Sequence, residues 1–101
     1  MIKTDIIDGL EVYSCQPTRK TKRPLLLFIH GAFAGGWMWT DTFMPALARA
    51  GYPCYALSLR GHGGSHGRER IDWHSIADYV DDVATIVDGL AAPPVLIGHS
   101  M

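Results

Sequence analysis

The sequence predicts an α/β fold in which an antiparallel hairpin is followed by parallel strands joined by crossover helices. Three observations carry this prediction. Two apolar-rich segments flank an Asp-Gly dipeptide, the later apolar runs are short and lack polar alternation, and segments with helical spacing separate these later runs. Short apolar runs of this kind are typical of strands buried on both faces of a parallel sheet, and their alternation with helices indicates crossover connections.

The hairpin is expected over residues 2–7 and 10–15. Asp8 and Gly9 between them suit a two-residue type I′ turn, because both residue types adopt the positive φ angles that this turn requires. A polar loop follows over residues 16–24. Its positive charges are interpreted as solvated, because no aromatic residue or second basic patch accompanies them.

Three further strands are expected over residues 25–29, 53–57 and 94–97, each a short apolar run. The first two are connected by a glycine-rich loop and a helix over residues 39–50. Gly51 stands where the glycine that closes a helix belongs, because helices commonly end at a residue in the left-handed conformation.

A second helix is expected to begin at Ser75, because Ser75-x-x-Asp78 forms a variant of the capping box. Its apolar residues recur at steps of three and four, which is the spacing of one helix face: Ile76, Val80, Val83, Val87 and Leu90. The aspartates of this helix are expected mostly on its solvated face, as charges for solubility and not as metal ligands: Asp78, Asp81, Asp82 and Asp88.

Composition excludes several classes of function. The chain has 101 residues, of which 48% are hydrophobic and 19% charged, with a net charge of −1. This near-neutral charge gives no reason to expect a nucleic acid as partner. No apolar stretch approaches the roughly 20 residues of a transmembrane segment, and the N-terminus lacks the pattern of a signal peptide. Cys15 and Cys54 are too few for a disulfide scaffold. We therefore expect a cytoplasmic protein without cofactor or metal.

The residues able to carry chemistry follow the three later strands. His30 and Gly31 come after the first, Arg60 lies in a glycine-rich loop after the second, and Gly98-His99-Ser100-Met101 follow the third. Because parallel strands end at the same edge of a sheet, these loops are expected to meet in one crevice. An apolar strand running into Gly-x-Ser predicts a nucleophile elbow with Ser100 at its tip. The alternative is an ordinary turn, with a positive φ at Gly98 and Ser100 capping a helix.

Taken together, the three loops resemble the N-terminal part of an α/β-hydrolase, an esterase or lipase with some similarity to the methylesterase and hydroxynitrile lyase branch around residues 30–39. The resemblance rests on His30-Gly31, on Arg60-Gly61-His62-Gly63-Gly64-Ser65 and on Gly98-His99-Ser100-Met101. It implies that residues 1–101 form a partial α/β-hydrolase domain that ends at the nucleophile elbow. The acidic residue that is usual in this family two places before the arginine is replaced here by Ser58.

The resemblance also implies a function and a site. Ser100 would attack the carbonyl of a small-molecule ester or related acyl substrate, and the backbone N–H groups of Ala32 and Met101 would form the oxyanion hole. Phe33 and Trp37 are candidates for the substrate pocket. Supporting roles in the loops fall to five residues: His30, Gly31, Arg60, Gly98 and His99. Among these, we expect Arg60 to brace the loops by hydrogen bonds, while Trp39 is expected in the core.

Other interpretations remain beside this one. In this family the acid and the histidine base follow the serine, so residues 1–101 alone are expected to lack both and to be inactive. The same scaffold also supports lyases, C–C hydrolases and non-catalytic ligand-binding proteins. A serine at position 100 argues against relatives with an aspartate nucleophile, such as epoxide hydrolases and dehalogenases. The glycine loops match neither a dinucleotide fingerprint nor a phosphate loop, and His62 and His66 lack a third zinc ligand nearby.

Overall fold

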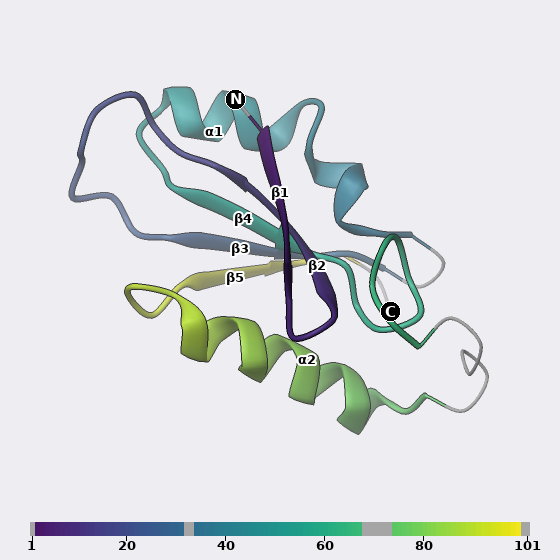
Figure 1. The fold of residues 1–101 in the computed structure, drawn as a ribbon. Coiled ribbons are helices and arrows are strands. Elements are labelled where there is room, and N and C mark those ends of the chain that lie inside the picture. The colour runs from purple at the N-terminus through teal and green to yellow at the C-terminus, as the bar shows by residue number, and fades with distance from the viewer. Residues whose placement is uncertain (1, 32–33, 68–73, 100–101) are drawn as a thin grey trace.

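The computed structural model describes residues 2–31, 34–67 and 74–99, and it confirms the predicted α/β class (Figure 1). The chain runs, in order, through β1 (Ile2–Ile7), β2 (Leu10–Cys15), β3 (Leu26–Ile29), the short 3₁₀-helix η1 (Gly36–Trp39), α1 (Phe43–Arg49), β4 (Cys54–Leu57), α2 (Ile76–Gly89) and β5 (Val95–Gly98).

The strands form one mixed sheet in the order β1-β2-β4-β3-β5. The β1–β2 and β2–β4 pairs are antiparallel, while the β3–β4 and β3–β5 pairs are parallel. Because β4 and β5 flank β3 on opposite sides, right-handed crossovers send α1 and α2 to opposite faces of the sheet. Figure 1 shows this arrangement, with α1 above the strands and α2 below them. The predicted order of an antiparallel hairpin followed by parallel strands is confirmed.

The hairpin turn has the predicted conformation. Asp8 has a φ of 50° and Gly9 a φ of 79°, so both central residues are in the left-handed region that a type I′ turn requires. The turn sets the register in which Ile7 faces Leu10. This register places Leu10 and Val12 in the core, while the neighbouring Glu11 points to the other face of the sheet.

The core consists of two apolar layers, one on each face of the sheet. On the α1 side, Met44 and Ala48 pack against the strand residues Cys15, Leu26, Phe28, Cys54 and Ala56, together with Trp39. On the α2 side, Ile86 packs against Leu10, Val12, Leu27, Leu57 and Leu59. The alternation along β3, with Leu26 and Phe28 on one face and Leu27 on the other, explains why a continuous apolar run is needed there.

The first helix is shorter than predicted. The prediction over residues 39–50 is wrong at its start, because η1 ends at Trp39 and α1 begins at Phe43. The reason is Pro45, which lacks an N–H group and would clash inside a longer helix, but is tolerated in the first turn of α1. The C-terminal end is as expected. Gly51 has a φ of 99° and donates its N–H to Ala48, while the Tyr52 N–H donates to Leu47, which is a Schellman motif.

Each of the three later strands begins one residue after its predicted start, at Leu26, Cys54 and Val95. Two of these shifts follow from prolines at positions 53 and 94, which have no N–H group to donate within a sheet. Their neighbours make the first bonds instead: the Leu26 N–H donates to the Pro53 carbonyl at 2.9 Å, and the Val95 N–H donates to the Leu25 carbonyl at 2.8 Å.

The capping box predicted for the second helix is confirmed. The Ser75 hydroxyl accepts a hydrogen bond from the Asp78 N–H, and the Asp78 carboxylate accepts one from the Ser75 N–H. Within the described ranges, no helix has the length and apolar character needed to cross a membrane.

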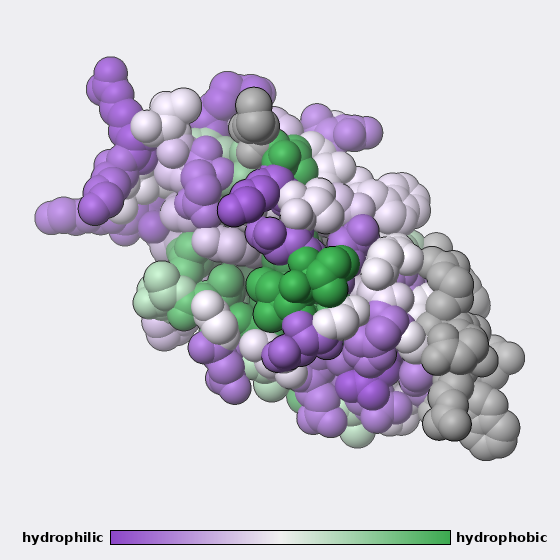
Figure 2. Space-filling model, viewed as in Figure 1, coloured by the Kyte–Doolittle hydropathy of each residue, from purple (hydrophilic) through white to green (hydrophobic). Residues whose placement is uncertain are grey.

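One apolar surface is left open beside β5, the edge strand at one end of the sheet. Leu96 on β5, and Ile76 and Val80 on α2, are about half exposed or more, with values from 52% to 61%. Figure 2 shows apolar side chains gathered on the face of the molecule where the hairpin and α2 lie, among polar surroundings.

Candidate active site

The three strand-end loops start at the same level of the sheet. Ile29 at the end of β3 is the register partner of Leu57 in β4 and of Gly98 in β5. The residues that follow are linked across the strands, because the His99 N–H donates to the Ile29 carbonyl at 3.1 Å. The described parts of the loops therefore lie side by side at the carboxyl ends of the parallel strands, where sheets of this kind bind ligands.

Four of the proposed site residues lie outside the described residues: the nucleophile Ser100, the oxyanion donors Ala32 and Met101, and the pocket candidate Phe33. Gly98 is a strand residue paired with Ile29, and its φ lies outside the left-handed region.

The two tryptophans of the loop after β3 have different environments. Trp39 is 5% exposed and packs against Phe28, with 4.9 Å between the ring centroids, which confirms its predicted place in the core. The centroids of the Trp39 and His99 rings are 6.3 Å apart, and the two rings meet edge to face. Trp37 is 55% exposed and lies at the surface of η1. His99 is thus positioned by the core of the α1 layer, next to the position of Ser100.

His30 joins the loops after β3 and β4. Its ring is fully buried, and its Nε2 accepts a hydrogen bond from the Leu59 N–H at 2.9 Å. Nε2 therefore carries no proton, and the protonated Nδ1 donates to the Gly31 carbonyl at 2.6 Å. Burial, partly opposed by the Gly31 bond and assisted by His62, lowers the pKa of His30. The ring is thus held neutral and fixes the carbonyl of Gly31, directly before the proposed oxyanion donor.

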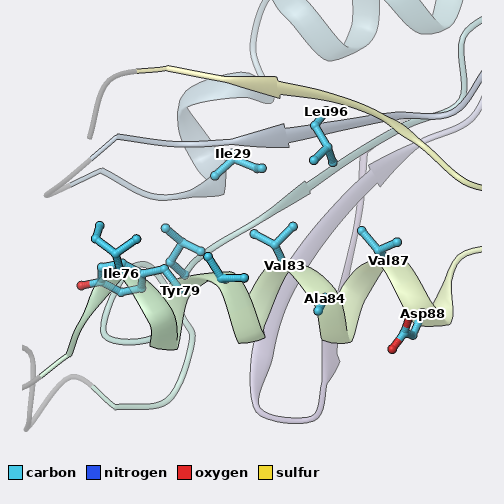
Figure 3. Close-up of a pocket in the computed structure, with 10 residues that line it drawn as sticks. Ile29, Ile76, Tyr79, Val83, Ala84, Val87, Asp88 and Leu96 are labelled. Carbon is cyan, nitrogen blue, oxygen red and sulfur yellow. The ribbon is translucent and has the colours of Figure 1, made fainter.

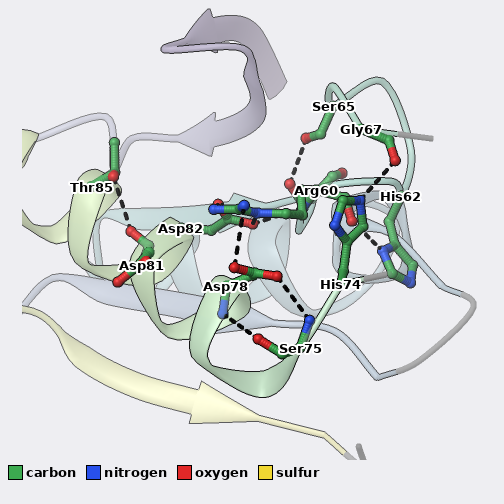
Figure 4. A network of polar contacts seen from close by, with 11 residues as sticks. Arg60, His62, Ser65, Gly67, His74, Ser75, Asp78, Asp81, Asp82 and Thr85 are labelled. Carbon is green, nitrogen blue, oxygen red and sulfur yellow. Dashed lines mark hydrogen bonds and ion pairs between the residues drawn. The ribbon is translucent and has the colours of Figure 1, made fainter. Parts of the chain in front are cut away.

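Arg60 braces the loop after β4 against α2, as the sequence predicts (Figure 4). Its Nη2 and Nε donate to Asp82 Oδ1 at 2.8 Å and 3.1 Å, and its backbone N–H donates to Asp82 Oδ2 at 2.8 Å. Asp78 adds a looser ion pair at 3.6 Å. Arg60 thus contacts two carboxylates of α2 and links the loop after β4 to this helix.

The prediction that Asp82 lies on a solvated face is wrong. Its side chain is 3% exposed and faces the sheet side of α2. The physical reason is its position on the helix: Asp82 follows Tyr79 by three residues and precedes Ile86 by four, and both of these pack on the sheet. The spacing was available in the sequence, but the partner that neutralises the charge, Arg60, lies 22 residues away. Asp81, one residue earlier, is exposed as predicted.

The histidines of the long loop make structural contacts. His62 Nδ1 lies 3.0 Å from the Arg60 carbonyl, and the His62 ring lies between His30 and Tyr79. His66 instead faces the hairpin, where its backbone N–H donates to the Gly9 carbonyl at 2.8 Å. His74 Nε2 lies 2.7 Å from the Gly67 carbonyl. Within the described part of the chain, no group of three His, Cys, Asp or Glu residues is arranged to hold a metal ion.

A groove of about 470 Å³ lies between α2 and the edge of the sheet (Figure 3). Leu96 and Ile29 point into it from the strands, and Tyr79, Val83 and Val87 point into it from α2. Its lining is almost entirely apolar, so it offers hydrophobic contact and few hydrogen bonds. The groove is continuous with the exposed side of β5 and is separate from the Arg60 network.

Comparison with known proteins agrees with this geometry. A family model described as "Alpha/beta hydrolase family" matches residues 26–101, which is most of the chain and includes all three strand-end loops. The chain belongs to the alpha/beta hydrolase family.

Three curated relatives of this chain differ in their named activities. "Bifunctional epoxide hydrolase 2" of Mus musculus is 32% identical over 77 residues, covering 75% of this chain and 14% of its own length. "Monoacylglycerol lipase" of Mycolicibacterium smegmatis is 41% identical over 58 residues, covering 52% and 20%. "Protein phosphatase methylesterase 1" of Bos taurus is 35% identical over 81 residues, covering 77% and 21%. The chain thus spans about a fifth or less of the length of these hydrolases.

Solved structures give the same family. A thioesterase domain from the curacin biosynthetic pathway matches with a TM-score of 0.73 and 29% identity, covering 100% of this chain and 35% of its own. A laboratory-evolved variant of a potato epoxide hydrolase matches with a TM-score of 0.78 and 26% identity, covering 99% and 32%. The chain is therefore similar to hydrolases of esters, thioesters and epoxides.

Proposed function

We propose that this chain is part of a larger α/β-hydrolase domain that acts as a serine hydrolase on carboxylic esters or related acyl compounds. The observation that carries the proposal is the shared level of the three strand ends. β5 continues through Gly98 to His99, whose N–H donates to the Ile29 carbonyl directly before the His30-Gly31 pair. In the sequence, Ser100 follows His99 and Ala32 follows Gly31. This is the relation that a nucleophile and an oxyanion loop need, because both must reach one carbonyl group.

The reaction would proceed in two steps. Ser100 Oγ attacks the substrate carbonyl, its proton passes to a histidine base, and the carbonyl oxygen becomes an anion held by the N–H groups of Ala32 and Met101. Collapse of this intermediate expels the alcohol, which takes the proton from the histidine. Water then attacks the acyl-enzyme in the same way, and the carboxylic acid is released. In this family the base and its acidic partner follow the serine, so both are assigned to sequence beyond residue 101.

The larger domain is supported by two observations. The chain spans 14–24% of the first curated relatives, so most of a hydrolase of that size is not contained in it. The apolar groove beside β5 also has the character of a surface that other elements cover, since it is formed by side chains such as Leu96 and Val80 that are half exposed. The substrate, and any partner of the whole protein, depend on parts outside these 101 residues.

A second candidate function is the hydrolysis of epoxides, because relatives with this name match three quarters of the chain. The serine at position 100 favours the ester hydrolase instead, because epoxide hydrolases of this fold are expected to carry an aspartate nucleophile there. An aspartate forms an ester with the opened epoxide, and water can hydrolyse this ester. A serine would form an ether, which water cannot hydrolyse under these conditions.

The two candidates are separated by a direct assay on the complete protein. Initial rates are measured with p-nitrophenyl butyrate and with styrene oxide, for the wild type and for Ser100→Ala. The proposal expects ester hydrolysis that falls by about 10⁶-fold in kcat in the variant, and no epoxide opening above background. Epoxide opening by the wild type, or ester hydrolysis that survives Ser100→Ala, would contradict it.

A further inference from the structure

A carboxylate from outside the three strand-end loops lies between two of them. Glu11 belongs to β2, and its Oε1 accepts hydrogen bonds from the Ser58 hydroxyl at 2.8 Å and from the Gly64 N–H at 3.0 Å. The Ser58 hydroxyl in turn accepts a hydrogen bond from the Gly36 N–H at 2.9 Å. Glu11 is thus connected to the loop after β4 directly and to the loop after β3 through a single hydroxyl group.

The backbone of the loop after β4 is shaped around this carboxylate. A Cβ atom at Gly63 would lie 2.5 Å from Ser58 Oγ and 2.6 Å from Glu11 Oε1, and one at Gly64 would lie 2.5 Å from Glu11 Oε2. A side chain at either position would push the Glu11 carboxylate or the Ser58 hydroxyl out of its place. The adjacent glycines therefore let the main chain approach Glu11 closely. This contact accounts for the glycines, so they need not form a binding loop for a phosphate or nucleotide.

Glu11 is itself held in place by its main chain. The Ser58 N–H donates to the Glu11 carbonyl at 2.8 Å, and the Glu11 N–H donates to Ser65 Oγ at 2.8 Å. The Ser65 hydroxyl also donates to the Ser58 carbonyl. Since β2 is an inner strand of the sheet, paired with both β1 and β4, the carboxylate is presented from a rigid support.

We propose that Glu11 is a positioning residue of the active site, which acts through Ser58 to fix the loop that carries the oxyanion donor Ala32. Gly36, the group held by Ser58, lies four residues after Ala32, and the other end of this loop is fixed by the bond from Ala34 N–H to the Gly31 carbonyl at 3.3 Å. The inference rests on the proposed function, because this loop is the proposed oxyanion loop.

Glu11 also accounts for the serine at position 58. The resemblance to the family leads us to expect an acidic residue there, which would accept the loop hydrogen bonds by itself. Here the short hydroxyl of Ser58 is buried, and the negative charge comes from the neighbouring strand, 47 residues earlier in the sequence. In this chain the negative charge beside the loops therefore comes from β2 and not from position 58.

Transferring the carboxylate from position 11 to position 58 tests the positioning role of Glu11. The variants are Glu11→Ala, Glu11→Gln, Ser58→Asp and the double variant Glu11→Gln/Ser58→Asp, all in the complete protein. Glu11→Ala should lower kcat on p-nitrophenyl butyrate by about 10- to 100-fold and change KM by less than about twofold, because a displaced oxyanion donor acts on the transition state. Glu11→Gln keeps the acceptor oxygen without the charge, and its loss should be smaller.

The double variant gives the decisive comparison. Ser58→Asp alone places two carboxylates within about 3 Å and should lower kcat by about tenfold, because like charges at this distance repel. Adding Glu11→Gln removes this repulsion, since the amide donates to the new carboxylate, and kcat should return to within about threefold of the wild type. If Glu11 does not act on the loop through position 58, the two losses are additive and kcat does not recover.

Amide hydrogen exchange reads the positioning without any use of activity. Peptides covering residues 34–39 and 61–67 should exchange about tenfold faster or more in Glu11→Ala, and regain protection in the double variant relative to Ser58→Asp. Asp5→Asn, which removes an exposed carboxylate from β1, is the matched control and should change neither kcat nor exchange in these peptides.

The outcomes separate the two proposals. If the wild type does not hydrolyse esters, the proposed function fails, and exchange in the two peptides still decides the positioning. If exchange is unchanged in Glu11→Ala, or the double variant is no better than Ser58→Asp, Glu11 does not position the loop. Should Glu11→Ala not fold, Glu11→Gln and the double variant carry the same comparison.

Discussion

Removal of either partner of the Arg60–Asp82 ion pair is predicted to destabilise the complete protein, and by different amounts. Arg60→Met leaves the Asp82 carboxylate, 3% exposed, with a single backbone N–H as partner, and should cost about 3–5 kcal/mol of unfolding free energy. Asp82→Asn leaves an arginine that is 22% exposed and still near Asp78. Because that charge remains partly solvated, the loss should be smaller, about 2 kcal/mol.

The double variant Arg60→Met/Asp82→Asn distinguishes an ion pair from two independent contacts. It contains no unpaired buried charge, and the asparagine oxygen still accepts from the backbone N–H of residue 60. It should therefore be more stable than Arg60→Met alone, with a coupling of about 2 kcal/mol or more. Urea unfolding followed by tryptophan fluorescence, with an unchanged m-value, gives these numbers.

Asp81→Asn provides the matched control, because Asp81 is the exposed neighbour of Asp82 on the same helix. Its effect should remain within about 0.5 kcal/mol. If Asp82→Asn behaves like Asp81→Asn, or if adding it to Arg60→Met lowers stability further by its full single-variant amount, Arg60 does not brace the loop through Asp82.

Three further predictions concern single residues. Burial lowers the pKa of His30 in the folded protein below its unfolded value of about 6.5. The contribution of the neutral ring to the free energy of unfolding is therefore complete above about pH 6.5, and it is lost as the pH falls from there towards the lower folded pKa. Urea unfolding at several pH values should show a flatter pH dependence in this range for His30→Gln. Burial, with a smaller contribution from Cys15, raises the pKa of Cys54 to about 11, so about 0.1% of this thiol is ionised at pH 8. Iodoacetamide should therefore modify Cys54 in urea but not in the native protein, which mass spectrometry measures. Gly51→Ala should cost about 1–2 kcal/mol in the same unfolding assay, because an alanine is strained at a φ of 99°; an unchanged midpoint would contradict the Schellman motif.

The parts of the fold that depend on local chemistry could be predicted from the sequence. Asp8-Gly9 requires only its own two φ angles, and the Ser75 capping box joins residues three positions apart, so neither depends on the rest of the chain. The start of α1 is also local, since Pro45 determines it, although the apolar and aromatic residues before it suggested a longer helix. Local rules thus account for the order of the elements and for most of their ends.

A bracing role for Arg60 could be expected, but the partners in the polar contacts that hold the loops could not be predicted, because they are far apart in the sequence. Asp82 and Arg60 are separated by 22 residues, and Glu11 and Ser58 by 47. Glu11 meets the loop after β4 because β2 pairs with β4 in the sheet, and no pattern within β2 reveals that pairing. The spacing of Asp82 from Tyr79 and Ile86 was the one available signal, and the general rule that aspartates are solvated outweighed it.

The central claim is that Ser100 is a nucleophile activated for acyl transfer. Reaction of the complete protein with a fluorophosphonate probe, followed by intact mass and peptide mapping, tests it most directly. We expect one adduct on the peptide that contains Ser100. It should be lost in Ser100→Ala and retained in Ser14→Ala, which changes a serine of β2 away from the strand-end loops. Labelling that survives Ser100→Ala, or a wild-type protein that hydrolyses esters without forming the adduct, would contradict it.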